Sequence, residues 1–358
     1  MNKLKKINIY FSWTELPTYG YFLLKYIHLN LKKNKFINFR VISNPNSFQK
    51  SYKENNNFYK TIIWIKKNNI YSWKDLGLVT PDIFFQSGWS VRCFNYLGKL
   101  VKNKNNTVVI GVDNSVQKRN IRQFLGSLYF KIFKKKKFDY ATVPGKSGID
   151  LMMKFGFKKN EIFTGVYSSL NRIYKNKIIP EKRKKQFIYV GQFIERKNII
   201  RLINAFKNAT QNNKTYKLVM VGNGPLKIKK KELANNIKII KNLSPKELSN
   251  LYNESQFFIL PSLREHWGLV VHEASLSGCF LLLSKNVGSI PEFSNKKNSI
   301  LFDPKSAYSI EKSLKKAMLL SNKKLILANK ESERLGKLNN YNNFLNNVYK
   351  IINKSSKI

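Results

Sequence analysis

Residues 260–292 read LPSLREHWGLVVHEASLSGCFLLLSKNVGSIPE and contain two carboxylates eight positions apart, Glu265 and Glu273. A Trp-Gly pair between them interrupts a helical register, so we expect Glu265 on a loop and Glu273 in the first turns of a helix that begins near Leu269. The start of such a helix presents free N–H groups and a positive dipole end, which favours binding of an anion. A carboxylate on the loop, an anion at the helix start and a second carboxylate for ribose hydroxyls would suit a nucleotide sugar.

Three other segments of the C-terminal half combine an apolar strand with a turn or a helix. They read FIYVGQFIERKNIIRLINAF (187–206), YKLVMVGNGPLKIKKK (216–231) and LSPKELSNLYNESQFFILPS (243–262). Taken with residues 260–292, and in this order, they resemble glycosyltransferase family 4, whose members share the two-domain GT-B fold. The resemblance is firm over roughly residues 187–305 and much looser over the N-terminal half.

The resemblance implies a retaining, metal-independent hexosyltransferase that moves a sugar from a nucleotide-diphosphate donor to an acceptor hydroxyl. Two adjacent cations would bind the diphosphate, one carboxylate would bind ribose and the other would orient the sugar. The donor-binding residues so implied are Gly191, Arg196, Lys197, Gly222, Trp267, Gly268, Leu269 and Glu273. The catalytic residues are Glu265, Arg196 and Lys197, with Asp113 added from the N-terminal half. No cofactor and no metal ion is expected besides the donor substrate.

These motifs also have a plainer explanation. Glu265 and Glu273 could be solvated helix charges, since surface carboxylates are common. However, the chain has only 20 acidic residues among 358, and two of them fall in this motif. Arg196 and Lys197 belong to a chain in which basic pairs abound. Their position after an apolar strand and at a helix entrance favours contact with a diphosphate.

The N-terminal half departs from the family at one position. Family members often have a His after a strand of the first domain, whereas VVIGVDNSVQKRN (108–120) has Asp113 there. Asp113 could hydrogen-bond the sugar or the acceptor hydroxyl from the same place, or it could only cap the next helix. Segments 13–19 and 86–89 also end predicted strands, and we expect them to line the acceptor side.

Apolar runs of strand length alternate with helix-period segments, which predicts parallel sheets flanked by helices. Twelve strands are predicted, at 7–11, 39–42, 61–65, 83–86, 108–112, 140–143, 162–164, 187–190, 218–221, 237–239, 257–260 and 280–284. The expected fold class is α/β, a GT-B arrangement of two Rossmann-like parallel-sheet domains facing across a cleft. We expect these domains at 1–170 and 187–339, a charged linker at 171–186, and a C-terminal helix within 340–358 that can cross back to the first domain.

The formal net charge of +46 first suggests a nucleic-acid-binding protein. Its distribution argues against this class, because the excess is spread evenly, at +24 over residues 1–175 and +22 over residues 176–358. No RNA-recognition motif and no interleaving of aromatic and basic residues is found. We therefore expect no nucleic-acid partner. A basic α/β nucleic-acid-binding protein without enzymatic activity stays as the alternative, and a GT-B protein that has lost its activity is a third interpretation.

Cys93 and Cys279 are the only cysteines and lie far apart in the sequence, which argues against a disulfide scaffold and is typical of a reducing cytoplasm. His266 and His272 lie near the second of them, but no ligand cluster accompanies them, so no metal site is expected. No apolar run reaches the roughly 18 residues needed to span a bilayer. We expect a cytoplasmic protein. The resemblance implies a saccharide or lipid-linked saccharide acceptor, in the assembly of a bacterial surface polysaccharide such as lipopolysaccharide or capsule.

Residues 121–137, IRQFLGSLYFKIFKKKK, have apolar side chains at helix spacing and end in four Lys. One interpretation is a helix whose apolar face packs on the domain core. The other is an interfacial surface that docks on the anionic inner leaflet of the cell membrane, where a lipid-linked acceptor would be found. The second interpretation would make the protein peripheral to the membrane.

Overall fold

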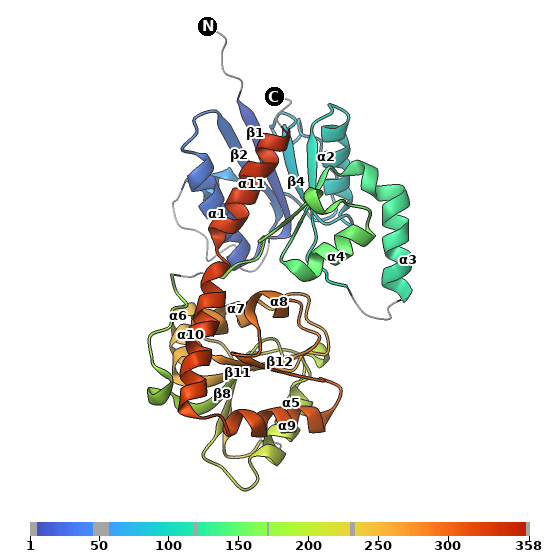
Figure 1. The fold of residues 1–358 in the computed structure, drawn as a ribbon. Coiled ribbons are helices and arrows are strands. Elements are labelled where there is room, and N and C mark those ends of the chain that lie inside the picture. The colour runs from blue at the N-terminus through green and yellow to red at the C-terminus, as the bar shows by residue number, and fades with distance from the viewer. Residues whose placement is uncertain (1–5, 46–56, 117–120, 170–171, 230–232, 356–358) are drawn as a thin grey trace. The chain divides into compact units, whose positions relative to one another are not determined.

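The computed structural model describes residues 6–45, 57–116, 121–169, 172–229 and 233–355. The chain forms two compact units. The first takes in the chain up to Ser168 together with the C-terminal helix from Tyr341, and the second extends from Ser169 to Asn340. Each unit contains a parallel β-sheet covered by helices (Figure 1). The predicted α/β class with two parallel-sheet domains is therefore confirmed.

The sheet of the first unit has seven parallel strands in the order β3-β2-β1-β4-β5-β6-β7. The strands are β1 (Ile7–Glu15), β2 (Ile37–Asn44), β3 (Ile62–Trp64), β4 (Ile83–Ser87), β5 (Thr107–Gly111), β6 (Tyr140–Val143) and β7 (Ile162–Thr164). The helices are α1 (Thr18–Leu31), α2 (Arg92–Lys102), α3 (Ile121–Tyr129), α4 (Lys146–Lys154) and α11 (Tyr341–Ser355). The chain order reverses between β1 and β4, and in open α/β sheets a ligand crevice forms at the carboxyl ends of such a pair.

Both faces of this sheet are buried, which explains why its strands are continuous apolar runs rather than alternating ones. In β1, Ile9 and Phe11 pack on one side with α1 and α11. Tyr10 points to the opposite face, where it packs with Phe84 and with Phe94 of α2. Neighbouring side chains of an extended strand point to opposite faces of the sheet. One apolar strand therefore contributes side chains to the core on each face.

Helix α11 completes the first unit, although it comes last in the sequence. Phe344, Val348 and Ile351 are buried in the core that α1 also covers. The Asn347 side chain donates a hydrogen bond to the carbonyl oxygen of Thr164, at 2.8 Å. The segment that the sequence predicts as a C-terminal helix within 340–358 therefore packs on the sheet of the N-terminal half.

The sheet of the second unit has six parallel strands in the order β10-β9-β8-β11-β12-β13. The strands are β8 (Lys184–Val190), β9 (Lys217–Val221), β10 (Ile237–Ile240), β11 (Ser255–Leu260), β12 (Phe280–Ser284) and β13 (Ser299–Phe302). The helices are α5 (Ile199–Ala209), α6 (Pro245–Glu254), α7 (Leu269–Leu276), α8 (Ile290–Phe293), α9 (Ala307–Met318) and α10 (Asn322–Leu338). Here the order reverses between β8 and β11, which predicts a ligand crevice beyond the ends of those two strands.

All twelve predicted strands are present, and β13 was missed. That strand is a short run, SILF, at the edge of its sheet, and only its last residue is buried. The segment 13–19 is not a single loop, because β1 continues to Glu15 and α1 begins at Thr18.

Residues 172–186, predicted within a linker, pack into the second unit, and β8 already begins at Lys184. The reason is Arg183, whose buried guanidinium donates to the carbonyl oxygens of Ile178 (2.8 Å), Ser255 (3.2 Å) and Ser277 (2.7 Å). A charge buried in this way is held by several acceptors at once. Asn171, the first residue of the predicted linker, lies outside the described residues.

The interpretation that the apolar face of segment 121–137 packs on the core is wrong. The apolar side chains that defined that face are all exposed: Ile121, Phe124, Leu125, Leu128, Ile132 and Phe133. Within the described parts of the chain, every helix is too short or too polar to cross a bilayer.

Candidate active site

Two loops meet at the carboxyl ends of β8 and β11. Arg196 and Lys197 lie in a single 3-10 turn between β8 and α5. The backbone of this turn is tied to the loop after β11, because the N–H of Leu263 donates to the carbonyl oxygen of Arg196 at 2.9 Å. In the other direction, the Arg196 guanidinium donates a hydrogen bond to the carbonyl oxygen of Arg264 at 2.7 Å. The predicted basic pair therefore lies where the strand order reverses.

Glu265 joins the same cluster from the loop after β11. Its carboxylate is buried and forms an ion pair with the equally buried ammonium of Lys197. Arg196 Nη1 lies 3.6 Å from the same carboxylate oxygen, and Ser262 Oγ lies 3.4 Å from it. Two cations face one carboxylate here, so the cluster has an excess positive charge that an anionic ligand can neutralise.

Helix α7 begins directly after this loop. Gly268 precedes its first residue with φ of +86°, a left-handed conformation that favours glycine, and no side chain caps the helix start. The indole of Trp267 is buried and meets the ring of Phe293 edge-on at 5.8 Å. The first N–H groups of α7, from Leu269 onward, therefore point toward the loop without a side-chain partner, as an anion site requires.

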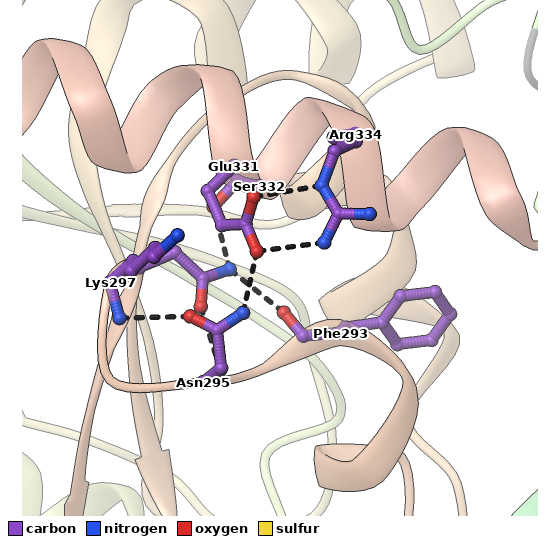
Figure 2. Close-up of polar contacts among 7 residues, drawn as sticks. Phe293, Asn295, Lys297, Glu331, Ser332 and Arg334 are labelled. Atoms are coloured by element: carbon purple, nitrogen blue, oxygen red, sulfur yellow. Dashed lines mark hydrogen bonds and ion pairs between the residues drawn. The ribbon is translucent and has the colours of Figure 1, made fainter.

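A polar network surrounds the backbone of Phe293, the residue against which Trp267 of this loop packs. Figure 2 shows Glu331 of α10 accepting bonds from Asn295 (2.6 Å) and from Arg334 (2.8 and 2.9 Å). The Phe293 carbonyl oxygen accepts a bond from Asn298 (2.9 Å), while its ring points away from the network (Figure 2). That ring packs against Trp267 and stacks on His272 at 4.6 Å. The network thus fixes the ring on which the loop rests.

The two predicted donor-side glycines lie at a close approach of backbones. Gly191 follows β8 and Gly222 follows β9, and the N–H of Gly191 donates to the carbonyl oxygen of Val221 at 3.0 Å. A Cβ on Gly222 would lie 1.9 Å from the carbonyl oxygen of Gly191. Any side chain at 222 would push the two loops apart, which explains the glycine there.

Glu273 lies in the second turn of α7, half-buried, with tyrosines around it. The Tyr252 hydroxyl donates to its carboxylate at 3.2 Å, and Tyr174 also donates to it. Burial raises the pKa of Glu273 to about 7, although the two hydroxyls act in the opposite direction. These tyrosines come from distant parts of the chain, and no local pattern in the sequence marks them as neighbours of Glu273.

His272 is a residue whose role the sequence did not predict. Its ring is fully buried, Nδ1 accepts a bond from the N–H of Ser169 at 3.0 Å, and Nε2 lies 3.0 Å from the carbonyl oxygen of Gly336. Burial lowers its pKa to about 4, so the ring is neutral at neutral pH. Within the described residues, no three His, Cys, Asp or Glu side chains are grouped to hold a metal ion.

The first unit has its own cavity of about 590 Å³, formed at the carboxyl ends of β1, β4 and β5. Its wall includes residues of both predicted acceptor segments, 13–19 and 86–89, as well as Asp113. Trp13, Tyr19 and Tyr167 form one aromatic group on the wall, with ring centroids 5.2–6.2 Å apart. Flat apolar faces with polar edges of this kind suit a ligand that has both apolar and hydroxylated surfaces.

Asp113 is exposed on the wall of this cavity. The Tyr167 hydroxyl donates to its carboxylate at 3.4 Å. Burial raises the pKa of Tyr167 well above its usual range, which keeps the phenol protonated as a donor. Asp113 lies eight positions before the first residue of α3, so it does not cap that helix. The sequence did not predict that Tyr167 and Phe344 also line the cavity, since both come from distant segments.

Residues 171–336 match the protein family described as Glycosyl transferases group 1. This stretch, just under half of the chain, is similar to the group 1 glycosyltransferases. The matched stretch contains the cluster of Arg196, Lys197 and Glu265 as well as Glu273. The alternative of a basic nucleic-acid-binding protein is not favoured.

Known proteins also resemble the chain beyond the matched stretch. Over 229 residues, 63% of this chain and 48% of the other, it is 28% identical to an uncharacterized glycosyltransferase of Methanocaldococcus jannaschii. The curated relatives are matched over only 33% and 48% of their own lengths. In structure it is similar to HepE of Anabaena in complex with UDP and glucose, with a TM-score of 0.73 and 11% identity over 97% of this chain and 100% of that one. It is also similar to WaaG, a glycosyltransferase involved in lipopolysaccharide biosynthesis, with a TM-score of 0.64 and 15% identity over 96% and 99% of the two chains. At these identities the likeness establishes the GT-B fold.

Proposed function

We propose that the protein is a retaining glycosyltransferase of family 4 that moves a hexosyl group from a nucleotide-diphosphate sugar to an acceptor hydroxyl. The observation that carries this proposal is the cluster of Lys197, Arg196 and Glu265 at the reversal of strand order, directly before the start of α7, which no side chain caps. It combines two fixed cations with helix N–H groups, the combination that a diphosphate needs. HepE of Anabaena, which has the same fold, is seen with UDP and glucose.

In the proposed reaction Arg196 and Lys197 bind the diphosphate, and Glu273 accepts hydrogen bonds from the ribose hydroxyls. Glu265 and the backbone of 267–269 orient the sugar. The bond between the anomeric carbon and the phosphate oxygen breaks while the acceptor oxygen bonds to the same face of that carbon. The hydroxyl proton leaves with the diphosphate. Negative charge grows on the diphosphate as the bond breaks, so the two cations stabilise the transition state more than the bound donor.

The acceptor in this proposal is a saccharide or a lipid-linked saccharide, bound in the cavity of the first unit. Asp113 would hydrogen-bond the acceptor hydroxyl or the transferred sugar there, and the aromatic group of Trp13, Tyr19 and Tyr167 would pack on the acceptor. We propose assembly of a bacterial surface polysaccharide, lipopolysaccharide or capsule, on the cytoplasmic side of the membrane. The likeness to WaaG supports this pathway.

We also propose that the reaction needs no metal ion. Arg196 and Lys197 supply two fixed positive charges at the diphosphate, which is the role that a divalent cation plays in other phosphate sites.

A thermal-shift screen tests the function. We expect UDP, GDP or ADP, or one of their sugars, to raise the melting temperature, since a ligand that binds only the folded state stabilises it. At a hundred times its Kd, the stabilisation is about 2.7 kcal/mol. EDTA should leave the shift unchanged. A chain that no nucleotide protects but that binds nucleic acid in a salt-dependent way would refute the proposal.

Donor binding should depend on pH through Glu273. Its pKa of about 7 means that the carboxyl group becomes ionised between roughly pH 6 and 8, and the ionised form is the better acceptor for ribose hydroxyls. We therefore expect the donor KM to fall about five- to tenfold as the pH rises through 7. The measurement is initial rate against donor concentration over pH 5.5–8.5, an interval of about 1.5 units on either side of the expected pKa.

Glu273→Gln is the matched variant, because it keeps the shape of the side chain and cannot ionise. Its donor KM should be raised and flat across this pH range, with a smaller change in kcat, since the ribose contact exists in ground and transition states alike. A wild-type KM that does not change with pH, or a variant that keeps the wild-type KM, would remove Glu273 from the ribose site.

A further inference from the structure

Helix α3 and the wide turn that continues it, Phe130–Lys134, carry a row of exposed apolar side chains. We name this row the apolar ridge. Its members are Ile121, Phe124, Leu125, Leu128, Tyr129, Ile132 and Phe133, each between 45% and 75% exposed. Single exposed apolar residues are ordinary on a protein surface, but seven within thirteen positions on one helical segment indicate an interaction site.

The ridge is not exposed because the segment is loosely attached. The opposite side of the segment is anchored by Phe130, which is fully buried. Its ring stacks on Phe155 at 4.4 Å and meets Trp89 edge-on at 5.5 Å. The Ser127 side chain is buried as well. The segment therefore has one face packed in the first unit and a second, more apolar face that points outward.

The turn Phe130–Lys134 has i→i+5 hydrogen bonding, whereas α3 has the ordinary helical repeat. Wide turns of this kind recur at functional sites. Here the rings of Tyr129 and Phe133 lie 5.2 Å apart, so the ridge continues past the end of α3. The ridge spans both parts of the segment as one surface.

The charged residues of the segment itself have a single sign. Segment 121–137 contains six basic residues and no acidic one. Arg122, Lys131, Lys136 and Lys137 are exposed, while Lys134 lies over the Tyr129 ring at 5.5 Å. Lys135 pairs with Glu161 at 3.3 Å. Long basic side chains beside apolar ones can place their charges at the level of lipid headgroups while the apolar side chains enter the acyl region.

We propose that the apolar ridge is a membrane-docking surface, on which the protein binds a bilayer that contains anionic lipids, with α3 lying in the plane of the interface. Apolar burial and attraction of headgroups act together in such binding, and stable anchoring takes both. A second copy of the chain fits less well, because a symmetric contact between two ridges would bring twelve basic residues together without an acidic partner from this segment. An acidic protein partner would match the charge but not the extent of the apolar row.

The docking surface belongs to the unit that holds the proposed acceptor cavity. That the docking surface brings a lipid-linked acceptor close to this cavity rests on the proposed function. Binding of the surface to lipid does not. The two can therefore be tested separately, with lipid binding measured in the absence of nucleotide and acceptor.

The test is sedimentation of the full chain with vesicles of phosphatidylcholine alone or of equal parts phosphatidylglycerol and phosphatidylcholine. We expect binding to the anionic vesicles and at least tenfold weaker binding to the neutral ones. Phe124→Ser, Leu128→Ser and Ile132→Ser together should reduce binding to anionic vesicles at least tenfold. Lys134→Gln, Lys136→Gln and Lys137→Gln together should reduce it about a hundredfold, because each basic side chain near an anionic surface contributes about fivefold.

The matched control replaces three exposed apolar residues of the second unit, Tyr308, Leu319 and Leu327, by Ser and should bind vesicles as the wild type does. All variants should keep the wild-type melting temperature and its shift by nucleotide, which separates a failure of this inference from a failure of the proposed function. Wild-type binding that the ridge variant retains would overturn the inference. A dimer in light scattering that the ridge variant dissociates, without vesicle binding, would overturn it in favour of a second copy.

Discussion

Replacing Arg196 and Lys197 together by Ala should lower kcat/KM for sugar transfer at least about a hundredfold. Each hydrogen bond to a charged group contributes about 1.5–3 kcal/mol, and each 1.36 kcal/mol corresponds to a factor of ten in rate. The loss should appear in kcat as well as in KM, because charge on the diphosphate grows as its bond to the sugar breaks. Initial rates at several donor concentrations, with a saturating acceptor, measure both constants.

The double variant can also lose stability, because Lys197 is the buried partner of Glu265. Without Lys197 the carboxylate keeps only Arg196, and loss of one member of a buried ion pair commonly costs about 3–5 kcal/mol of stability. Arg196→Ala alone avoids this problem, because the Arg196 side chain is one-third exposed (33%) and Glu265 keeps its closer partner. The two effects need not add, since both cations act on one diphosphate.

Lys323→Ala with Lys324→Ala is the matched control. It removes the same charge from an exposed pair at the start of α10 and should leave kcat/KM within about twofold of the wild type. Arg196→Ala that folds and keeps wild-type transfer would remove this turn from the site and weaken the assignment of Glu265 along with it.

The strands of both sheets were predictable because parallel strands buried on both faces are continuous apolar runs. Strand β13, Ser299–Phe302, was not predicted: its three apolar residues stand between the polar stretch 294–299 and an Asp-Pro pair, at the edge of the sheet. The loop positions of Arg196, Lys197 and Glu265 could be predicted from local motifs. Lys197 and Glu265 are 68 residues apart in the sequence and pair because β8 and β11 are neighbours in the sheet. The sequence alone did not predict that the two strands are neighbours.

Side-chain environments were less predictable than positions. The periodicity of segment 121–137 predicts an apolar face correctly, but it does not tell which partner that face meets. The side chain that packs inward is Phe130, which does not belong to the apolar ridge. The raised pKa of Glu273 depends on burial and on Tyr174 and Tyr252, which fold against it from distant segments. A motif indicates which carboxylate is a candidate for the site, whereas the fold determines the pH at which that carboxylate is ionised.

Asp113→Asn should lower kcat about a hundredfold and leave the donor KM within about twofold of the wild type. Asp113 lies on the cavity of the first unit, while the proposed donor residues lie on the second, so donor binding should not depend on it. A carboxylate that accepts a hydrogen bond from the acceptor hydroxyl or the reacting sugar in the transition state accounts for an effect of this size, since a hydrogen bond to a charged group contributes about 1.5–3 kcal/mol and each 1.36 kcal/mol is a factor of ten in rate. Initial rates at saturating donor and acceptor measure kcat.

The Asn variant tests chemistry rather than folding, because its amide oxygen can still accept the bond that the Tyr167 hydroxyl donates to Asp113. Asp150→Asn is the matched control, since Asp150 is an exposed carboxylate of the same unit that lies outside the cavity wall. It should retain wild-type kinetics. If Asp113→Asn does the same, Asp113 only supports Tyr167 at the rim of the cavity. The group that replaces the family's histidine would then have to be sought among the other polar side chains of that wall, such as Ser87 and Asn114.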